Sequence, residues 1–263
     1  MKIFYNCLLL VMSLLVFSCQ NNNEEGIDTT TERDIEVNSL LQKEREATTI
    51  NVNHRYNYYG KEFEVTYVFD NETKKIIDAY GDVAIAKEIF SKEKSPEGSL
   101  VVSKEENKRF VAINFMIFDT AGEIDIHLEK TSGKIKEKVP SSLNRNKCFN
   151  TSLYGETDVH FYEDTGYNRE FHNIKGIDRR VHGIQYLSTE NDKISSFYMN
   201  SPKRAQLHFY EHSCYTGKRL TFDKGFNSFY GVNDLSLYTL SGWWFWRKSW
   251  NDQASSLWLI QRS

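Results

Sequence analysis

Two short segments in the second half of the chain carry residue types that could bind a hard metal ion. Residues 191–196 read NDKISS and residues 251–256 read NDQASS, so both follow the pattern Asn-Asp-x-x-Ser-Ser. Calcium takes about six to eight oxygen ligands from carboxylates, carbonyls, hydroxyls and water. Each segment offers such oxygens and contains no Cys or His. We therefore expect two calcium sites. The alternative is a pair of metal-free turns shaped by hydrogen bonds of Asn, Asp and Ser side chains.

Both segments belong to a larger internal repeat, which must supply the strands that position them. Residues 159–172 read VHFYEDTGYNREFH and residues 207–220 read LHFYEHSCYTGKRL. The metal-binding pattern follows each of them, twelve residues farther along in the second copy. Two landmarks that recur in the same order indicate a duplicated β motif, with repeats at about residues 157–200 and 205–263.

At these residues the chain resembles the βγ-crystallin family, whose domain pairs two four-stranded Greek-key motifs. Each motif of that family opens with aromatic-x-x-x-x-aromatic-x-Gly, which the second repeat matches with Tyr210, Tyr215 and Gly217. The first repeat has Tyr162 and Tyr167, but Arg169 replaces the glycine, so its first hairpin is expected to be distorted or shifted in register. The resemblance covers residues 155–263 and implies a mainly β fold with a double Greek-key β-sandwich.

The same resemblance implies which residues would bind calcium (Ca2+). One site would take side-chain oxygens of Asp192 and Ser195 and the carbonyl of Lys193. The other would take Asp252, Ser255 and the carbonyl of Gln253. Each site would borrow an oxygen from the opening strand of the opposite repeat, at Glu211 for the first and Glu163 for the second. Further residues would coordinate or hold the loops (Asn191 and Asn251) or hydrogen-bond within them (Ser196 and Ser256). The expected dissociation constant is on the order of 10⁻⁵ to 10⁻³ M, although many family members keep the fold and lose the metal.

The extra residues of the second repeat are rich in tryptophan. Trp250 and Trp258 are expected in the core. Trp243, Trp244 and Trp246 either pack under the loop or form an exposed patch that binds a glycan, a lipid interface or a protein partner. The adjacent Arg247 and Lys248 would suit an anionic surface. A protease inhibitor or an antimicrobial, toxin-like module on the same fold is the alternative function.

Residues 36–140 resemble no family that we recognise, and their pattern predicts a small antiparallel sheet with one short helix. Alternating apolar residues predict strands at 63–69 and 111–117. Residues 119–128 read DTAGEIDIHL, which predicts a hairpin into a strand carrying Ile124, Ile126 and Leu128. Asp82 is expected to cap a helix that begins at Val83. A linker is predicted between two domains, at residues 134–140.

The first residues read as a bacterial export signal. The apolar run of residues 8–17 is too short to span a bilayer. Val16-Phe17-Ser18-Cys19 resembles a lipobox, which implies cleavage of residues 1–18 and lipidation of Cys19. Residues 19–35 are polar and form a flexible tether. The expected location is therefore the outer membrane, lipid-anchored and exposed at the cell surface, with an ordinary secretory signal as the alternative.

The charge, the missing catalytic motifs and the cysteines limit which activities the chain could have. The chain has 33 basic and 36 acidic residues, for a net charge of −3, which argues against nucleic-acid binding. No zinc-binding helix, nucleophile elbow or phosphate loop is present, so we expect no enzyme. Export permits a disulfide between Cys148 and Cys214, but two free buried thiols fit the sequence equally well.

Overall fold

The computed structural model describes residues 48–91, 95–106, 110–132, 151–152, 157–174, 181–184, 186–224, 228–242 and 247–261. Several predicted features lie outside these residues: the export signal, the tether with Cys19, the linker at 134–140, Cys148, and Trp243, Trp244 and Trp246. None of the helices within the described residues is both long enough and apolar enough to cross a membrane.

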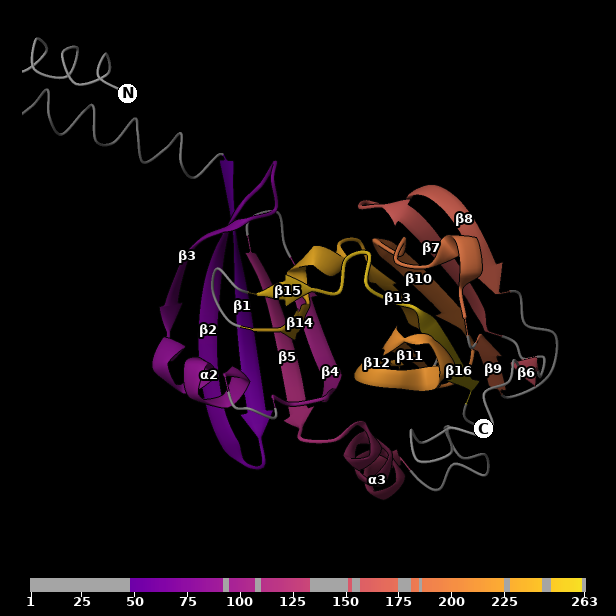
Figure 1. Cartoon of the computed structure of the whole chain (residues 1–263), viewed down its shortest axis with the longest axis horizontal. Helices are drawn as coiled ribbons and strands as arrows, with labels where there is room; N and C mark the ends of the chain where they lie inside the picture. Colours follow the sequence, from indigo (N-terminus) through magenta and orange to yellow (C-terminus); the bar gives the residue numbers. More distant parts are fainter. Residues whose placement is uncertain are drawn as a thin grey trace, which may run out of the picture. The chain divides into compact units, whose positions relative to one another are not determined.

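Five strands and two α-helices form the first part of the described chain (Figure 1). The strands lie in the order β3-β2-β1-β5-β4, and β1 runs parallel to β5 but antiparallel to β2. The predicted apolar faces at 63–69 and 111–117 are confirmed, because their alternate residues are buried on β2 and β5. The elements are β1 (Thr49–Tyr58), β2 (Lys61–Asp70), β3 (Ile76–Gly81), α2 (Val83–Phe90), β4 (Gly98–Glu106), β5 (Phe110–Phe118) and α3 (Ala121–Ser132).

Helix α2 begins at Val83 as predicted, but Asp82 does not cap it with its side chain. The Asp82 carboxylate instead accepts a hydrogen bond from the backbone N–H of Glu64, at 3.0 Å, and the N–H of Asp82 donates to the carbonyl of Glu64 at 2.7 Å. The residue therefore fastens the end of β3 to β2 rather than completing the first turn of the helix.

The hairpin predicted at residues 119–128 is wrong, because this segment forms helix α3. Ile124 and Leu128 are buried while Ile126 is 55% exposed, which is the i, i+4 spacing of a helix face. Glu123 accepts hydrogen bonds from the backbone N–H and the hydroxyl of Thr120, at 2.9 and 3.1 Å. This Thr-x-x-Glu contact resembles a capping box and marks the start of the helix.

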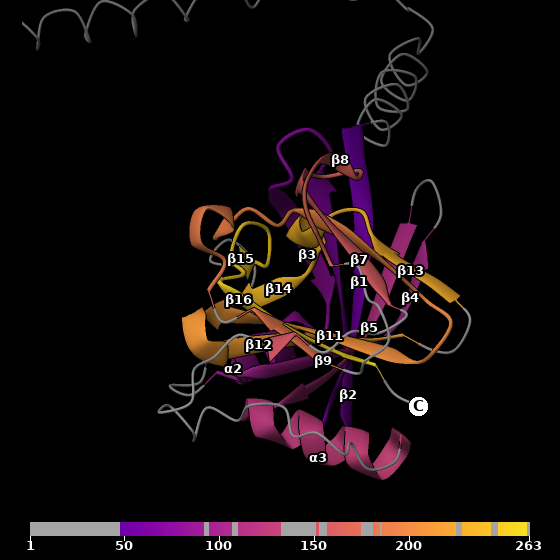
Figure 2. The ribbon, with the colours of Figure 1, turned by 90° about the vertical axis from the view of Figure 1, so that its right-hand side faces the viewer.

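The second part of the chain is a βγ-crystallin-like double Greek key. One sheet has the order β13-β10-β7-β8, and the strands β12-β11-β16-β9 follow one another in the other. Each sheet therefore takes one strand from the other repeat, β13 in the first and β9 in the second. The two sheets face each other across an apolar core (Figures 1 and 2). The strands are β7 (Asp158–Asp164), β8 (Asn168–Ile174), β9 (Val181–Ile184), β10 (Ser196–Ser201), β11 (Ala205–His212), β12 (Thr216–Lys224), β13 (Ser228–Val232) and β16 (Ser256–Gln261).

Short elements complete this part of the chain. Strand β6 (Thr151–Ser152) pairs with β9, and β14 (Thr239–Ser241) pairs with β15 (Lys248–Ser249). The described residues include the 3₁₀ turns η2 (Ser188–Glu190), η3 (Ser213–Tyr215) and η4 (Leu235–Leu237).

The two predicted domains are joined by a shared sheet. Strand β4 pairs in parallel with β12, with Gly98 opposite Arg219 and Val101 opposite Phe222. The result is one ten-stranded sheet, and residues Glu46–Ser263 form one unit. The fully buried Arg219 also donates two hydrogen bonds to the carboxylate of Asp125 on α3, at 3.0 and 3.2 Å.

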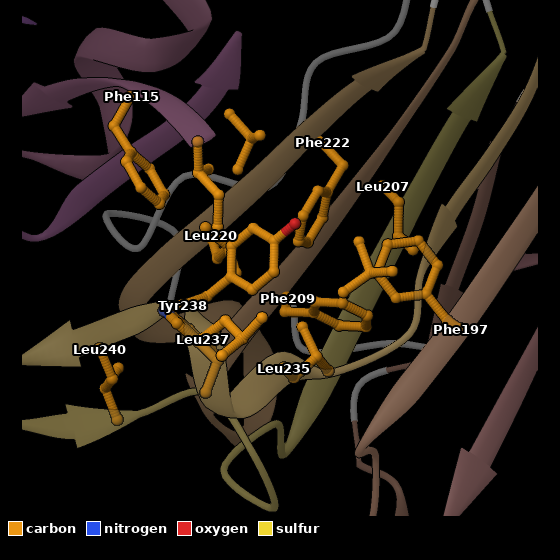
Figure 3. Packing of buried hydrophobic residues seen from close by; sticks show 14 of the residues in the cluster. Phe115, Phe197, Leu207, Phe209, Leu220, Phe222, Leu235, Leu237, Tyr238 and Leu240 are labelled. Atoms are coloured by element: carbon orange, nitrogen blue, oxygen red, sulfur yellow. The ribbon is translucent and has the colours of Figure 1, made fainter. Parts of the chain in front are cut away.

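A single hydrophobic cluster runs through both parts (Figure 3). The ring of Phe115 on β5 lies 6.1 Å from that of Tyr238, which lies 5.4 Å from the ring of Phe222 on β12. Phe222 in turn lies 4.9 Å from Phe197 on β10. The sandwich core and the core of the first sheet are therefore continuous.

Candidate cation sites

The hairpin turn that opens each repeat has the same backbone conformation in both. Positive φ angles occur at three matching positions, which are 166, 167 and 169 in the first repeat and 214, 215 and 217 in the second. Arg169 has φ +55° where Gly217 has φ +77°. The arginine therefore leaves the backbone of the first hairpin turn much like that of the second. The pairing of β7 with β8 shifts register by one residue between Phe161 and Tyr162. In the second repeat, the pairing of β11 with β12 shifts one residue pair later along the strand.

Each Asn-Asp-x-x-Ser-Ser loop is hydrogen-bonded to the first strand of its own repeat. The N–H of Ser195 donates to the carbonyl of Tyr162, and the N–H of Ser255 donates to the carbonyl of Tyr210, both at 2.9 Å. The hydroxyl of Ser196 donates to the carbonyl of Asp164 at 2.6 Å. The Ser256 hydroxyl makes the equivalent bond to His212, also at 2.6 Å.

The hydroxyls of Ser196 and Ser256 also accept the N–H groups of Tyr167 and Tyr215, at 3.2 and 3.1 Å. They were expected to hydrogen-bond within the loops. They instead connect each loop to the neighbouring hairpin turn.

The two loops contact each other reciprocally. The hydroxyl of Ser195 donates to Oδ1 of Asp252 at 3.0 Å, and the hydroxyl of Ser255 donates to Oδ1 of Asp192 at 3.3 Å. Backbone bonds cross in the same way, from Asp192 to the carbonyl of Ala254 and from Asp252 to the carbonyl of Ile194, both at 3.2 Å. Asp192 and Asp252 share a φ of +53°. The loops are thus related by a pseudo-twofold axis.

This crossing changes the predicted ligand sets. The sequence grouped each aspartate with the serine of its own loop, but the structure pairs it with the serine of the other loop. We define the Asp252 cluster as Asp252, Ser195 and Glu163 at the end of β7. The Asp192 cluster is Asp192 and Ser255, together with Glu211 at the end of β11, which the pseudo-twofold relation matches to Glu163.

The Asp252 carboxylate lies among other negative charges. Burial raises the pKa of its carboxyl, and the negative charges of Asp192, Glu163 and Asp164 raise it further, against the hydrogen bond from Ser195. Within the described part of the chain, no Lys or Arg lies at ion-pair distance from Asp192 or Asp252. A cation bound between the loops would therefore relieve the repulsion.

The two asparagines that precede these aspartates also match. Their Nδ2 groups donate to Oδ2 of Asp192 and of Asp252, at 2.7 and 2.8 Å. Their Oδ1 atoms, in Asn191 and Asn251, are buried and have no hydrogen-bond partner within the described ranges. Buried acceptors are normally satisfied, so two such atoms at equivalent positions indicate a missing partner that a cation could supply.

The donor set suits a hard cation. Carboxylate, hydroxyl and amide oxygens surround both clusters, and the backbone carbonyls of Lys193 and Gln253 directly follow the two aspartates. Among the described residues, no group of three or more His, Cys, Asp or Glu could hold a metal ion. A cation here would thus depend on hydroxyl, amide, backbone and water oxygens as well as on carboxylates, which calcium accepts.

The described residues next to the tryptophan segment differ in burial. Trp250 and Trp258 lie in the core as predicted, being 1% and 3% exposed. Arg247 and Lys248 were expected to suit an anionic surface. Arg247 is partly buried over the rings of Phe69 and Tyr67, 5.3 and 5.8 Å from their centroids. Lys248 is exposed.

Cys214, in the hairpin turn of the second repeat, is disulfide-bonded, and its partner lies outside the described residues. The covalent bond therefore starts from η3, within three residues of Glu211. The sequence had left a bridge and a free thiol equally open for this residue.

The solved structures named here match less than half of this chain. No protein-family model and no curated protein matches the chain. A solved structure described as "Evolution of the eye lens beta-gamma-crystallin domain fold" is 15% identical, with a TM-score of 0.28, and the match covers 44% of this chain and 93% of that one. A clostrillin double mutant in complex with nickel is 19% identical, with a TM-score of 0.21, and the match covers 39% and 97%.

Proposed function

We propose that this chain binds calcium at the Asp252 and Asp192 clusters and that calcium stabilises its Greek-key part. The main support is the crossed contact between the loops, which brings together two carboxylates that pair with no Lys or Arg of the described residues. A divalent ion in each cluster would neutralise this charge and use the unpartnered oxygens of Asn191 and Asn251.

Calorimetric titration of the full chain with calcium tests this proposal. At about 100 times the dissociation constant, each site would add about 2.7 kcal/mol to the free energy of unfolding. This corresponds to a rise in Tm of roughly 5–10 °C for a unit of this size. Asp192→Asn and Asp252→Asn should each remove one site. The control Asp78→Asn, an exposed carboxylate on β3, should change neither. No heat at millimolar calcium together with an unchanged Tm would refute the proposal.

The export signal supports a second part of the proposal, namely a lipid anchor at Cys19 in the bacterial envelope, with the folded part exposed at the surface. Replacement of Cys19 by Ala should release the protein from membranes. Metabolic labelling with a fatty acid should mark the original chain but not the variant. Retention of the variant on membranes would contradict the anchor.

We also propose that the chain acts by binding rather than catalysis. Histidines that could act as bases are used in structural contacts, such as that between His208 and the hydroxyl of Thr221, at 2.8 Å in the core. A glycan or an envelope protein would bind through Trp243, Trp244 and Trp246. Their joint replacement by Ser should abolish binding on a glycan array without lowering Tm. A large fall in Tm would instead assign them to the core.

A further inference from the structure

Arg169 occupies a backbone conformation that residues with a side chain rarely adopt. Its φ of +55° is left-handed, and a residue with a Cβ pays for this conformation roughly 1–2 kcal/mol. The matching position of the second repeat holds Gly217, which adopts φ +77° without this cost. The first repeat therefore keeps an arginine where the backbone favours glycine.

The arginine side chain returns to the end of strand β7. Its Nε and Nη2 atoms donate to the two carboxylate oxygens of Asp164, at 2.5 and 2.6 Å. Its Nη1 lies 3.7 Å from Oε2 of Glu163, which belongs to the Asp252 cluster. The guanidinium thus places a permanent positive charge beside one of the two candidate calcium sites.

The second repeat has no equivalent of this pair. Gly217 replaces the arginine, and His212 stands in the place of Asp164. His212 lies 4.0 Å from Glu211. The backbone N–H of Lys218 donates to Oε2 of Glu211 at 3.3 Å. The Lys218 ammonium donates to the hydroxyl of Ser95 and the carbonyl of Pro96, at 2.6 and 3.3 Å, and acts on Glu211 only from beyond ion-pair distance.

The strand end that carries the arginine's partners also holds the Asp252 cluster in place. The Ser195 N–H bonds to the carbonyl of Tyr162, and the Ser196 hydroxyl bonds to that of Asp164. The charges of Glu163 and Asp164 reach Asp252, where they oppose its ionisation. The guanidinium of Arg169, which lies beside these two carboxylates, therefore acts on the same site as a bound calcium ion.

We propose that Arg169 makes the two calcium sites unequal by serving as a built-in counter-charge for the Asp252 cluster. The proposal rests on the proposed calcium binding. Because like charges repel, Arg169 lowers the calcium affinity of this cluster more than that of the Asp192 cluster, which lies farther from it. In return, its pair with Asp164 keeps the hairpin turn in place when calcium is absent.

The test is a calcium titration of the full chain and its variants at about 10 mM ionic strength, where the Debye length is about 30 Å. Arg169→Asn removes the charge with a residue that tolerates left-handed φ. Arg169→Gly removes it with the residue of the second repeat, and Arg169→Lys retains it. Asp252→Asn and Asp192→Asn assign each binding step to its cluster.

We expect Arg169→Asn and Arg169→Gly to lower the dissociation constant of the Asp252 step about fivefold. This is the effect of one charge on a divalent ion across roughly 8 Å of water-like dielectric. The gain should shrink in 0.5 M salt, at roughly a 4 Å Debye length, and Arg169→Lys should resemble the original chain. In EDTA, Arg169→Asn should lose the protection of its hairpin amides against hydrogen exchange. Arg169→Gly should lose less of it, because glycine also avoids the cost of a Cβ at this φ.

If the Asn, Gly and Lys variants of Arg169 bind calcium with equal affinity at low salt, Arg169 is not a counter-charge. An increase in calcium affinity that 0.5 M salt does not reduce would also overturn this role. If the original chain binds no calcium at either cluster, the proposed function fails and this inference fails with it. Binding at both clusters that is insensitive to Arg169 would overturn the inference alone.

Discussion

The crossed contacts between the loops predict a specific pattern of energetic coupling. Ser195→Ala removes the donor to Asp252, and Asp252→Asn removes the charged acceptor. A hydrogen bond to a charged group contributes about 1.5–3 kcal/mol when buried. Because Asp252 is only partly buried, we expect a coupling free energy of about 1 kcal/mol between these two changes. The longer bond from Ser255 to Asp192 should give about 0.5 kcal/mol.

The assay is a double-mutant cycle on the free energy of unfolding, measured in urea with EDTA present. The decisive comparison is the pair Ser195→Ala and Asp192→Asn, which lie in the same loop. This pair should couple by less than about 0.3 kcal/mol. With calcium, Ser195→Ala and Asp252→Asn should weaken the same binding step. Stronger coupling within a loop than between loops would refute the crossed ligand sets and restore the grouping inferred from sequence.

Three further predictions concern the body of the fold. Burial lowers the pKa of His54, so stability should fall below about pH 6.5, where the unfolded chain takes up the proton, by up to about 1.4 kcal/mol per pH unit until the folded-state pKa is reached. His54→Gln should remove this slope in urea unfolding. Asp125→Asn should cost about 3 kcal/mol, because it leaves the buried guanidinium of Arg219 without its anion. Gly183→Ala should cost about 2 kcal/mol, since its Cβ would lie 2.2 Å from a buried indole carbon. Gly122→Ala, in open space on α3, should instead stabilise by about 0.5 kcal/mol.

Each of these predictions has a contrary outcome. A pH profile of stability that His54→Gln leaves unchanged would assign the slope to other groups. A variant with Asn at position 125 that unfolds at the original urea midpoint would mean that water satisfies Arg219. Equal changes in Tm for the two glycine variants would contradict the packing at Gly183.

Local patterns in the sequence predicted the strands and loops that depend on near neighbours. The alternation at 63–69 and 111–117 was sufficient for β2 and β5, because one face of each strand is buried. The same criterion failed at Ile124, Ile126 and Leu128. A spacing of two and a spacing of four both fit these residues, and the Thr120–Glu123 contact that decides for a helix was overlooked.

The pairing of strands that lie far apart in the chain could not be predicted from the sequence. Nothing in the residues of β4 or β12 identifies the other strand as its partner, because more than a hundred residues separate Gly98 from Arg219 and both strands mix apolar with charged residues. The bonds from Ser195 and Ser255 to the aspartate of the other loop could not be predicted for a related reason. The six-residue pattern identifies the oxygen ligands but not the direction in which each side chain points. That direction depends on how the two Greek keys pack together.

The place of β1 in the first sheet has a mechanical consequence. β1 is an interior strand, hydrogen-bonded along its length to β2 on one side and to β5 on the other. A pull applied at Thr48 along the strand would load both rows of hydrogen bonds in shear, so that they must break together rather than one at a time. Resistance to such a pull is set by the unfolding rate, and it would grow with the number of bonds on these two flanks.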